Sequence, residues 1–250
     1  MLRKANLILS ITSIPERVEL FLSNLHWLAE QTVQSRVTVI WLGSEYFSDS
    51  RRQYLSVRFP LPADIEIRYR PDLGPHTKLL YALKEFDNLP IVTADDDILY
   101  PPFWLEELYA SFQSAPQYVH CFRAHEMRIT PNGHLAPYLS WNWLAPGIRG
   151  PSRLLFPTGT SGVIYPATAL SKQVFDVEVM RALCPTSDDI WFKAMSLLNR
   201  TLVQKVRTES LEFPQIDGSE RRVLWRTNVE QNDVQLHRVF HHYGLYDYLF

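Results

Sequence analysis

The stretch IVTADDDILYP, residues 91–101, joins an apolar, strand-like run to three consecutive carboxylates, Asp95, Asp96 and Asp97. Like charges this close repel one another and raise each other's pKa unless a cation or a set of donors holds them ionised. In an open α/β sheet, ligands bind beyond the carboxyl ends of the strands, where the chain leaves the core. The stretch therefore predicts a central strand that delivers a carboxylate cluster to a binding site.

Segments on both sides of this strand alternate between strand and helix patterns, which is typical of a mostly parallel sheet covered on both faces. Apolar or alternating runs predict strands at residues 7–12, 36–43, 64–70, 89–97, 118–124, 161–166 and 201–207. Helical spacing predicts helices at residues 18–28, 48–59, 76–86, 102–112 and 187–199. A capping box at residues 13–16 is expected to start the first helix. No internal repeat or linker divides the chain, so we expect a single α/β domain.

The composition of the 250-residue chain is that of an ordinary globular protein, with 46% hydrophobic and 21% charged residues. The net charge of -2 provides no basic field, so no nucleic-acid partner is expected. The two cysteines, Cys121 and Cys184, cannot form a disulfide framework and favour a reduced, cytoplasmic location. The apolar start of the chain stops at Pro15 without a signal-peptide cleavage site, and no later run reaches the roughly 18 apolar residues of a membrane span. We therefore expect a soluble protein, or at most one attached to a membrane surface.

Three polar features fall where predicted strands end or helices begin, at residues 12–13, 95–97 and 187–189. Carboxylates with no Lys or Arg among them suit a hard divalent cation such as Mg²⁺ or Mn²⁺, which often keeps only one or two protein carboxylates. A metal held in that way would clamp a diphosphate. A solvated acidic turn is the alternative for residues 95–97, but the apolar strand before them and the prolines after them favour a fixed site.

Other charged groups lie in the first turns of predicted helices. Lys78, in DLGPHTKLL at residues 72–80, is placed unfavourably beside the helix dipole, so it is either solvated or reaches an anion that the helix terminus also attracts. Asp188 and Asp189 either stabilise the dipole of their helix or include a general base for an attacking hydroxyl. Because a helix N-terminus lowers the pKa of a carboxylate, burial by neighbours such as Trp191 would have to compensate in a base.

The chain resembles the GT-A-fold glycosyltransferases, in particular bacterial family 2-like enzymes of cell-surface polysaccharide and lipopolysaccharide assembly. The resemblance is carried by the segments SITSIPER at 10–17, DLGPHTKL at 72–79, VTADDDILYP at 92–101, GTSGVIYP at 159–166 and CPTSDDIWFKAM at 184–195. It implies a Rossmann-like domain with a mostly parallel central sheet flanked by helices. It also implies a nucleotide-binding half at 1–125, an acceptor-binding and catalytic half at 126–215, and a C-terminal lid and tail at 216–250.

The resemblance further implies a reaction and a role for each matching residue. A nucleotide-diphosphate sugar would donate its sugar to a hydroxyl of a glycan or lipid-linked glycan, with inversion and with the help of Mn²⁺ or Mg²⁺. On the donor side, Asp95 would contact the nucleotide, and Asp97 and Asp95 would bind the metal with the assistance of Asp96. Lys78 would lie near the base or phosphate. The nucleotide pocket would be lined by Thr12, Ile14 and Arg17. Asp189 would be the base that deprotonates the acceptor. Asp188 stands where the family usually has Glu, so both aspartates remain candidates for the base.

Several expectations remain open between two roles. A late histidine could join the metal, from among His237, His241 and His242. Arg221, Arg222 and Arg226 could form a lid or a solvated turn. The acceptor floor, or else the core, could use His125, Glu126, Tyr138, Trp141 and Trp143. Alternatives to a glycosyltransferase are a nucleotidyltransferase, although residues 10–17 lack the glycines of a triphosphate loop, and a non-catalytic glycan-binding module. A lipid-linked acceptor would place the protein at the inner face of the cell membrane.

Overall fold

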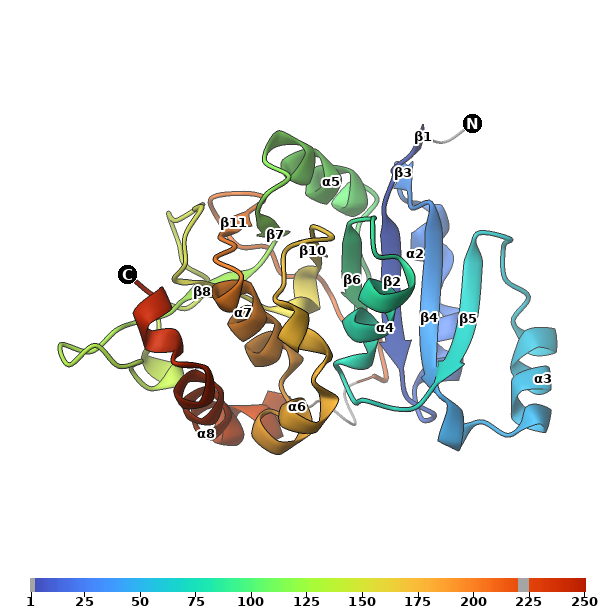
Figure 1. Ribbon diagram of the computed structural model, residues 1–250. Coiled ribbons are helices and arrows are strands. Elements are labelled where there is room, and N and C mark those ends of the chain that lie inside the picture. The colour runs from blue at the N-terminus through green and yellow to red at the C-terminus, as the bar shows by residue number, and fades with distance from the viewer. Residues whose placement is uncertain (1–2, 220–224) are drawn as a thin grey trace.

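A computed structural model of the chain describes residues 3–219 and 225–250 (Figure 1). Its centre is a seven-stranded sheet with the order β11-β7-β10-β6-β2-β4-β5. The strands are β2 Ile8–Ser13, β4 Val37–Gly43, β5 Ile65–Arg70, β6 Ile91–Asp95, β7 Val119–Cys121, β10 Val163–Tyr165 and β11 Val203–Lys205. Neighbouring strands run parallel, except that β10 is antiparallel to β6 and β7. The mostly parallel α/β sheet expected from the sequence is confirmed.

Helices cover both faces of the sheet, and Figure 1 shows α4 on one side and α2 on the other. Alternate side chains of a strand point to opposite faces, so Ile8 and Val39 join one apolar cluster with α4 and α7. Leu9 and Ile40 join a second cluster with α1 and α5. The helices are α1 Val18–Ser23, α2 His26–Ala29, α3 Asp49–Arg58, α4 Thr77–Glu85, α5 Trp104–Ser114, α6 Val177–Leu183, α7 Asp188–Leu198 and α8 Trp225–Tyr243.

Two short sheets lie outside the main one. β1 Arg3–Lys4 pairs with β3 Val33–Gln34, and β8 Ala124–Glu126 pairs with β9 Leu155–Pro157. The single strand expected at residues 118–124 is therefore wrong, because β7 stays in the main sheet while β8 leaves it to pair with β9. Short 3-10 helices occur at Ser44–Tyr46, Tyr138–Ser140, Gly159–Ser161, Lys172–Phe175 and Leu245–Tyr248.

The expected capping box at residues 13–16 is also wrong. Helix α1 begins at Val18, and its N-cap residue, Arg17, forms no side-chain cap hydrogen bond. The Ser13 hydroxyl instead donates to Asp96, at an Oγ to Oδ2 distance of 2.5 Å. Ser13 is the last residue of β2, so its side chain serves the neighbouring strand end rather than the helix.

The C-terminal residues form α8, a long helix that the sequence did not predict. Helix α8 contacts α6 and α7, and the ring of Tyr243 packs against Trp191. Arg221 and Arg222, the candidates for a lid, lie outside the described residues, as does the side chain of Arg226. Among the helices that the structure describes, none combines the length and the apolar character needed to cross a membrane.

Candidate functional site

The strand-end carboxylates, Asp95, Asp96 and Asp97, lie at the carboxyl end of β6. Thr12 of the neighbouring strand β2 pairs in register with Asp95, so the loop between β2 and α1 borders the same edge of the sheet. Thr12, in β2, and Ile14, in that loop, are half-buried, and the Thr12 hydroxyl donates to a backbone carbonyl of β4. The chain thus brings the first βα loop and the carboxylate cluster together, as strand-end positions in a parallel sheet require.

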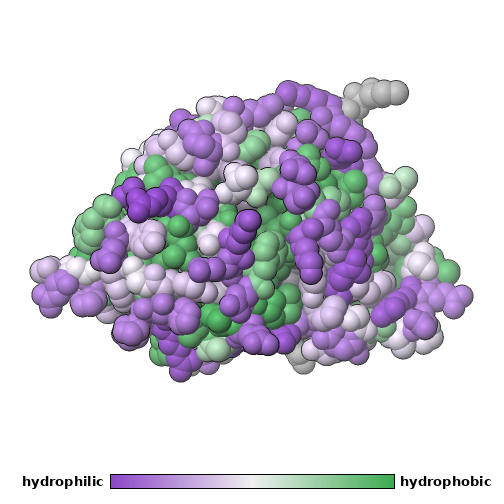
Figure 2. Space-filling model, in the orientation of Figure 1, coloured by the Kyte–Doolittle hydropathy of each residue, from purple (hydrophilic) through white to green (hydrophobic). Residues whose placement is uncertain are grey.

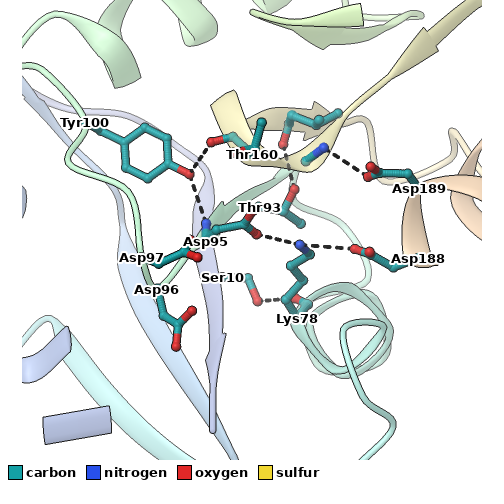
Figure 3. A network of polar contacts seen from close by, with 12 residues as sticks. Ser10, Lys78, Thr93, Asp95, Asp96, Asp97, Tyr100, Thr160, Asp188 and Asp189 are labelled. Carbon is teal, nitrogen blue, oxygen red and sulfur yellow. Dashed lines mark hydrogen bonds and ion pairs between the residues drawn. The ribbon is translucent and has the colours of Figure 1, made fainter. Parts of the chain in front are cut away.

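Lys78 connects Asp95 to the helix carboxylates, Asp188 and Asp189, at the start of α7 (Figure 3). Its Nζ lies 2.6 Å from Asp95 Oδ1 and 3.1 Å from Asp188 Oδ2, and its side chain is only 8% exposed. Burial alone lowers the pKa of Lys78, but the charges of Asp188 and Asp95 outweigh burial and raise this pKa well above its usual range. Lys78 is therefore a buried ammonium ion, not a solvated one, shared by carboxylates from two elements.

Asp189 accepts a hydrogen bond from the backbone N–H of Gly159, at 2.9 Å. A Cβ atom at Gly159 would lie 3.2 Å from both Asp189 Oδ1 and Lys78 Nζ, and 4.0 Å from Asp95 Oδ1. These three charged groups therefore converge on one short stretch of backbone, and a side chain at position 159 would crowd them. Sequence reasoning assigned Gly159 no role; the segment GTSG before β10 was the available signal.

The environment of Asp189 is unusual for a carboxylate at a helix N-terminus. The pKa of Asp189 is raised to about 8, because burial and the charge of Asp188 raise it by more than the ammonium of Lys78 lowers it. The lowering effect of the helix dipole is therefore outweighed. Asp189 still keeps part of its surface accessible, so it combines an elevated pKa with access from outside.

Arg17 and Asp96 form a second, separate ion pair. The guanidinium approaches Asp96 through two nitrogens, at 2.6 and 3.1 Å, and Ser13 donates to the same carboxyl. The Asp96 side chain is 2% exposed, so Asp96 anchors the loop between β2 and α1 from inside. In Figure 3 Asp96 points away from Lys78. Arg17 also reaches Asp97, with 3.6 Å between Nη1 and Oδ2.

The charge balance of the site favours an additional cation. Of the five carboxylates at positions 95, 96, 97, 188 and 189, four form ion pairs with Lys78 or Arg17, and Asp189 accepts from the backbone N–H of Gly159. Burial, together with the charges of Asp95 and Asp96, raises the pKa of Asp97 to about 6. The oxygen donors of Asp95 and Asp97 fit Mg²⁺ or Mn²⁺. Within the residues that the structure describes, no three Asp, Glu, His or Cys side chains form a ready-made metal cluster.

Tyr100 fixes the end of β6 against the turn that contains Gly159. Its hydroxyl accepts from the backbone N–H of Asp95, at 2.9 Å, and donates to the carbonyl of Thr160, at 3.1 Å (Figure 3). Tyr100 is 2% exposed, so both backbone groups depend on it for a partner inside the protein. Sequence reasoning noticed the rigid segment after the carboxylates but did not identify this hydroxyl.

Replacing Tyr100 by Phe is expected to destabilise the protein by about 2 kcal/mol, because two buried backbone groups lose their partner. Urea unfolding of the variant and of Tyr109→Phe measures the effect. Tyr109 is half-buried and its hydroxyl has no partner among the described residues, so its variant should change the free energy of unfolding by less than about 0.5 kcal/mol. Equal losses in both variants would contradict the role given to Tyr100.

The aromatic residues expected at an acceptor floor divide between core and surface. Tyr138 and Trp141 are buried and pack against Phe156 of β9, so these two rings belong to the core. Trp143 is half-buried, and its ring lies 4.2 Å from that of His125. Glu126 accepts from the side chain of Asn142, at 3.0 Å. Trp143 is thus the ring of this group with most surface left to meet a ligand.

The three histidines proposed as metal ligands lie on the surface of α8. His237, His241 and His242 are exposed on α8, and the rings of His237 and His241 stack on each other at 6.1 Å. The cavity of about 960 Å³ beside α1 and α2 is lined mainly by apolar side chains such as Leu22, Leu25 and Phe59. It contains none of the converging carboxylates, so we place the candidate site at the strand ends and not in this cavity.

Comparison with known proteins supports this fold assignment. No family model matches the chain, and the search of curated proteins found no match. Among solved structures, the chain is similar to a mannosyltransferase from Pyrobaculum calidifontis in complex with GDP-Man and Mn²⁺. The identity is 12%, the match covers 95% of this chain and 63% of that one, and the TM-score is 0.53.

Weaker similarities are found to S. aureus TarS in complex with UDP and to 4-diphosphocytidyl-2C-methyl-D-erythritol synthase. For TarS the identity is 13%, with 82% of this chain and 59% of that one covered and a TM-score of 0.47. For the synthase the identity is 12%, with 84% of this chain and 94% of that one covered and a TM-score of 0.46. This chain therefore spans less than two thirds of TarS and of the mannosyltransferase. The match to the mannosyltransferase shows that the chain has a GT-A-type fold.

Proposed function

We propose that the protein is an inverting, metal-assisted glycosyltransferase that moves a sugar from a nucleotide-diphosphate donor to a hydroxyl of a glycan acceptor. The observation that carries the proposal is the meeting of Asp95 from β6 with Asp188 and Asp189 from α7 around Lys78 and Gly159. It provides an acidic site for a cation and a separate carboxylate with a raised pKa within one cluster. These are the two groups that displacement of a nucleoside diphosphate by a hydroxyl requires.

On the donor side, Asp95 and Asp97 would hold the divalent cation, which neutralises the charge that develops on the leaving diphosphate. Thr12 and Ile14 would line the nucleotide pocket, because they lie at the end of β2 and in the loop after it, beside the carboxylates. Asp96 would act indirectly, since it is buried and holds Arg17 in place at the same loop. The half at residues 1–125 would thus bind the nucleotide.

On the acceptor side, Asp189 would take the proton from the attacking hydroxyl. Its raised pKa makes the ionised form a stronger base than an ordinary carboxylate. Asp188 is the weaker candidate because its carboxylate is already paired with Lys78 at 3.1 Å. Attack from the face opposite the leaving group inverts the configuration at the anomeric carbon. Residues 126–215 would provide this half of the site, and residues 216–250 a lid and tail.

The acceptor class is proposed from the surroundings of the base. Burial raises the pKa of Tyr138, the charge of Asp189 adds to this rise, and the ring of Tyr138 meets that of the half-buried Trp143 at 5.6 Å. An aromatic surface beside the base suits the apolar face of a sugar ring. We therefore propose a glycan or lipid-linked glycan acceptor for a cytoplasmic enzyme of bacterial surface-polysaccharide synthesis. Binding to the membrane surface follows if the lipid is required, and vesicle co-sedimentation with and without acceptor lipid tests it.

A donor-turnover assay tests the proposed function. The protein is incubated with UDP-, GDP-, CDP- and dTDP-sugars and Mn²⁺, and the release of nucleoside diphosphate is measured with water or simple glycans as acceptors. We expect release from one class of donor and loss of release in Asp189→Asn. Pyrophosphate release from a nucleoside triphosphate and a sugar phosphate would instead indicate a nucleotidyltransferase. Glycan binding without turnover of any donor would indicate a non-catalytic module.

A further inference from the structure

The ammonium of Lys78 lies where Asp95, a proposed metal ligand, meets the N-terminus of α7. It lies 2.6 Å from Asp95 and 3.1 Å from Asp188 (Figure 3). Lys78 stands in the first turn of α4, where the dipole of that helix disfavours a cation. The two carboxylates must therefore stabilise it, and the same two carboxylates would otherwise carry uncompensated negative charge inside the protein.

A second buried lysine shows that this arrangement is specific to the site. Lys193, on α7, is 1% exposed and donates to the backbone carbonyl of Arg153, at 2.7 Å. It has no ion pair among the described residues. Lys193 is thus held by a neutral carbonyl, whereas Lys78 neutralises Asp188 and Asp95, and a divalent cation would also use Asp95. Lys78 and such a cation compete for Asp95.

We propose that Lys78 makes binding of the divalent cation conditional on the nucleotide diphosphate. A free metal ion that binds Asp95 must displace the ammonium of Lys78 from that carboxylate. The ammonium then keeps Asp188 as its only carboxylate partner of the two. A diphosphate that arrives with the ion offers the ammonium a new anionic partner, so the two ligands bind together more tightly than either alone. The inference rests on the proposed function and adds an order of binding to it: the enzyme takes the metal–nucleotide complex and excludes the free metal.

Titration of MnCl₂ without any nucleotide tests this inference. We expect Lys78→Met to bind Mn²⁺ at least about tenfold more tightly than the wild type, because one nearby positive charge is gone. Its melting temperature should also rise with Mn²⁺, since bound ion replaces the missing cation. The matched control is Lys193→Met, which removes a buried lysine outside the site and should bind Mn²⁺ as the wild type does. Lys78→Gln repeats the test in a side chain that still donates to a carboxylate, in case the Met variant does not fold.

Equal Mn²⁺ affinity in the wild type and in both Lys78 variants would overturn the inference. So would an equal gain in Lys193→Met, because the effect would then be general to buried lysines. A second titration, of UDP or GDP with Mn²⁺ into the wild type, separates this result from the proposed function. If no nucleotide binds there, the proposed function fails, whereas the nucleotide-free comparison still decides whether Lys78 excludes the ion.

Discussion

Replacing Asp189 by Asn is expected to lower kcat by about a thousandfold while leaving the fold intact. Asn keeps the shape of Asp and an oxygen that accepts the hydrogen bond from Gly159, seen at 2.9 Å, but it cannot take a proton. Donor affinity should change little, because Asp189 is proposed to act on the acceptor hydroxyl and not to hold the donor. Asp188→Asn is the matched comparison, since it removes the neighbouring carboxylate and leaves the proposed base. A similar loss of kcat in both variants would mean that Asp189 is not the only residue that acts as the base.

The pH dependence of this variant provides an independent check. In the wild type the rate should rise with pH up to about 8, the pKa of Asp189, because only the ionised form accepts a proton. Burial is the main cause of this raised pKa, with the charges of Asp188 and Asp95 adding to it and Lys78 opposing it. The rising limb should be absent from the residual activity of Asp189→Asn. An unchanged profile would assign the limb to another group.

Stability should respond in the opposite direction to activity. The folded pKa of Asp189 lies above its ordinary value of 3.8, so the stability it contributes is present at low pH and is lost as pH rises through about 8. Asn carries no charge at any pH. Asp189→Asn is therefore expected to be more stable than the wild type at high pH and to differ little at low pH. Thermal unfolding across this pH range measures the difference.

Replacing Arg17 by Met is expected to destabilise the protein by about 3 to 5 kcal/mol, because it leaves the carboxylate of Asp96 buried without its cation. The Asp96 side chain is 2% exposed, and Arg17 contacts it through two nitrogens. Burial already raises the pKa of Asp96 against the opposing effects of Arg17 and Ser13. Loss of Arg17 should raise this pKa further, so the destabilisation should shrink at low pH, where Asp96 is protonated.

Two further variants show whether the loss comes from the buried charge. Arg51→Met removes an arginine whose pair with Glu19 is 40% exposed on both sides, and it should cost less than about 1 kcal/mol. The double variant Arg17→Met with Asp96→Asn removes both charges and should recover part of the stability. Urea unfolding of the wild type, Arg17→Met, Arg51→Met and the double variant measures these differences in the free energy of unfolding. No recovery in the double variant would show that Arg17 stabilises the loop through packing and not through Asp96.

The positions of the strands along the chain were predictable from sequence, because each buried strand has a local signal, whereas their order in the sheet was not. Residues 91–95 form an apolar run that ends abruptly at the carboxylates, and the structure places β6 there, beside β2. Residues 64–70 also have a local strand signal, and β5 forms there with every residue half-buried. Long helix α8 was missed because its sequence is mostly polar, so tertiary packing against α7 and not local pattern determines it.

The composition of the site was predictable, but its pairing was not. Asp95, Lys78 and Asp189 were each expected at the site from their positions at strand ends and helix starts, and the structure brings them together. The sequence showed carboxylates with no neighbouring cation, whereas Lys78 and Arg17 reach them from other elements. Such partners are distant along the chain, and spacing rules describe only local neighbours. Ser13 illustrates the same limit, since a local cap and a distant carboxylate competed for its hydroxyl.

Calorimetric titration of UDP, GDP and CDP, with and without Mn²⁺, into the wild type and Asp97→Asn tests the central claim most directly. That claim is that the strand-end carboxylates bind a metal-bound nucleoside diphosphate. We predict that one nucleotide binds tightly to the wild type only when Mn²⁺ is present, and that Asp97→Asn loses this metal-dependent binding. Absence of binding by every nucleotide under both conditions, or equal binding by the wild type and the variant, would contradict the claim.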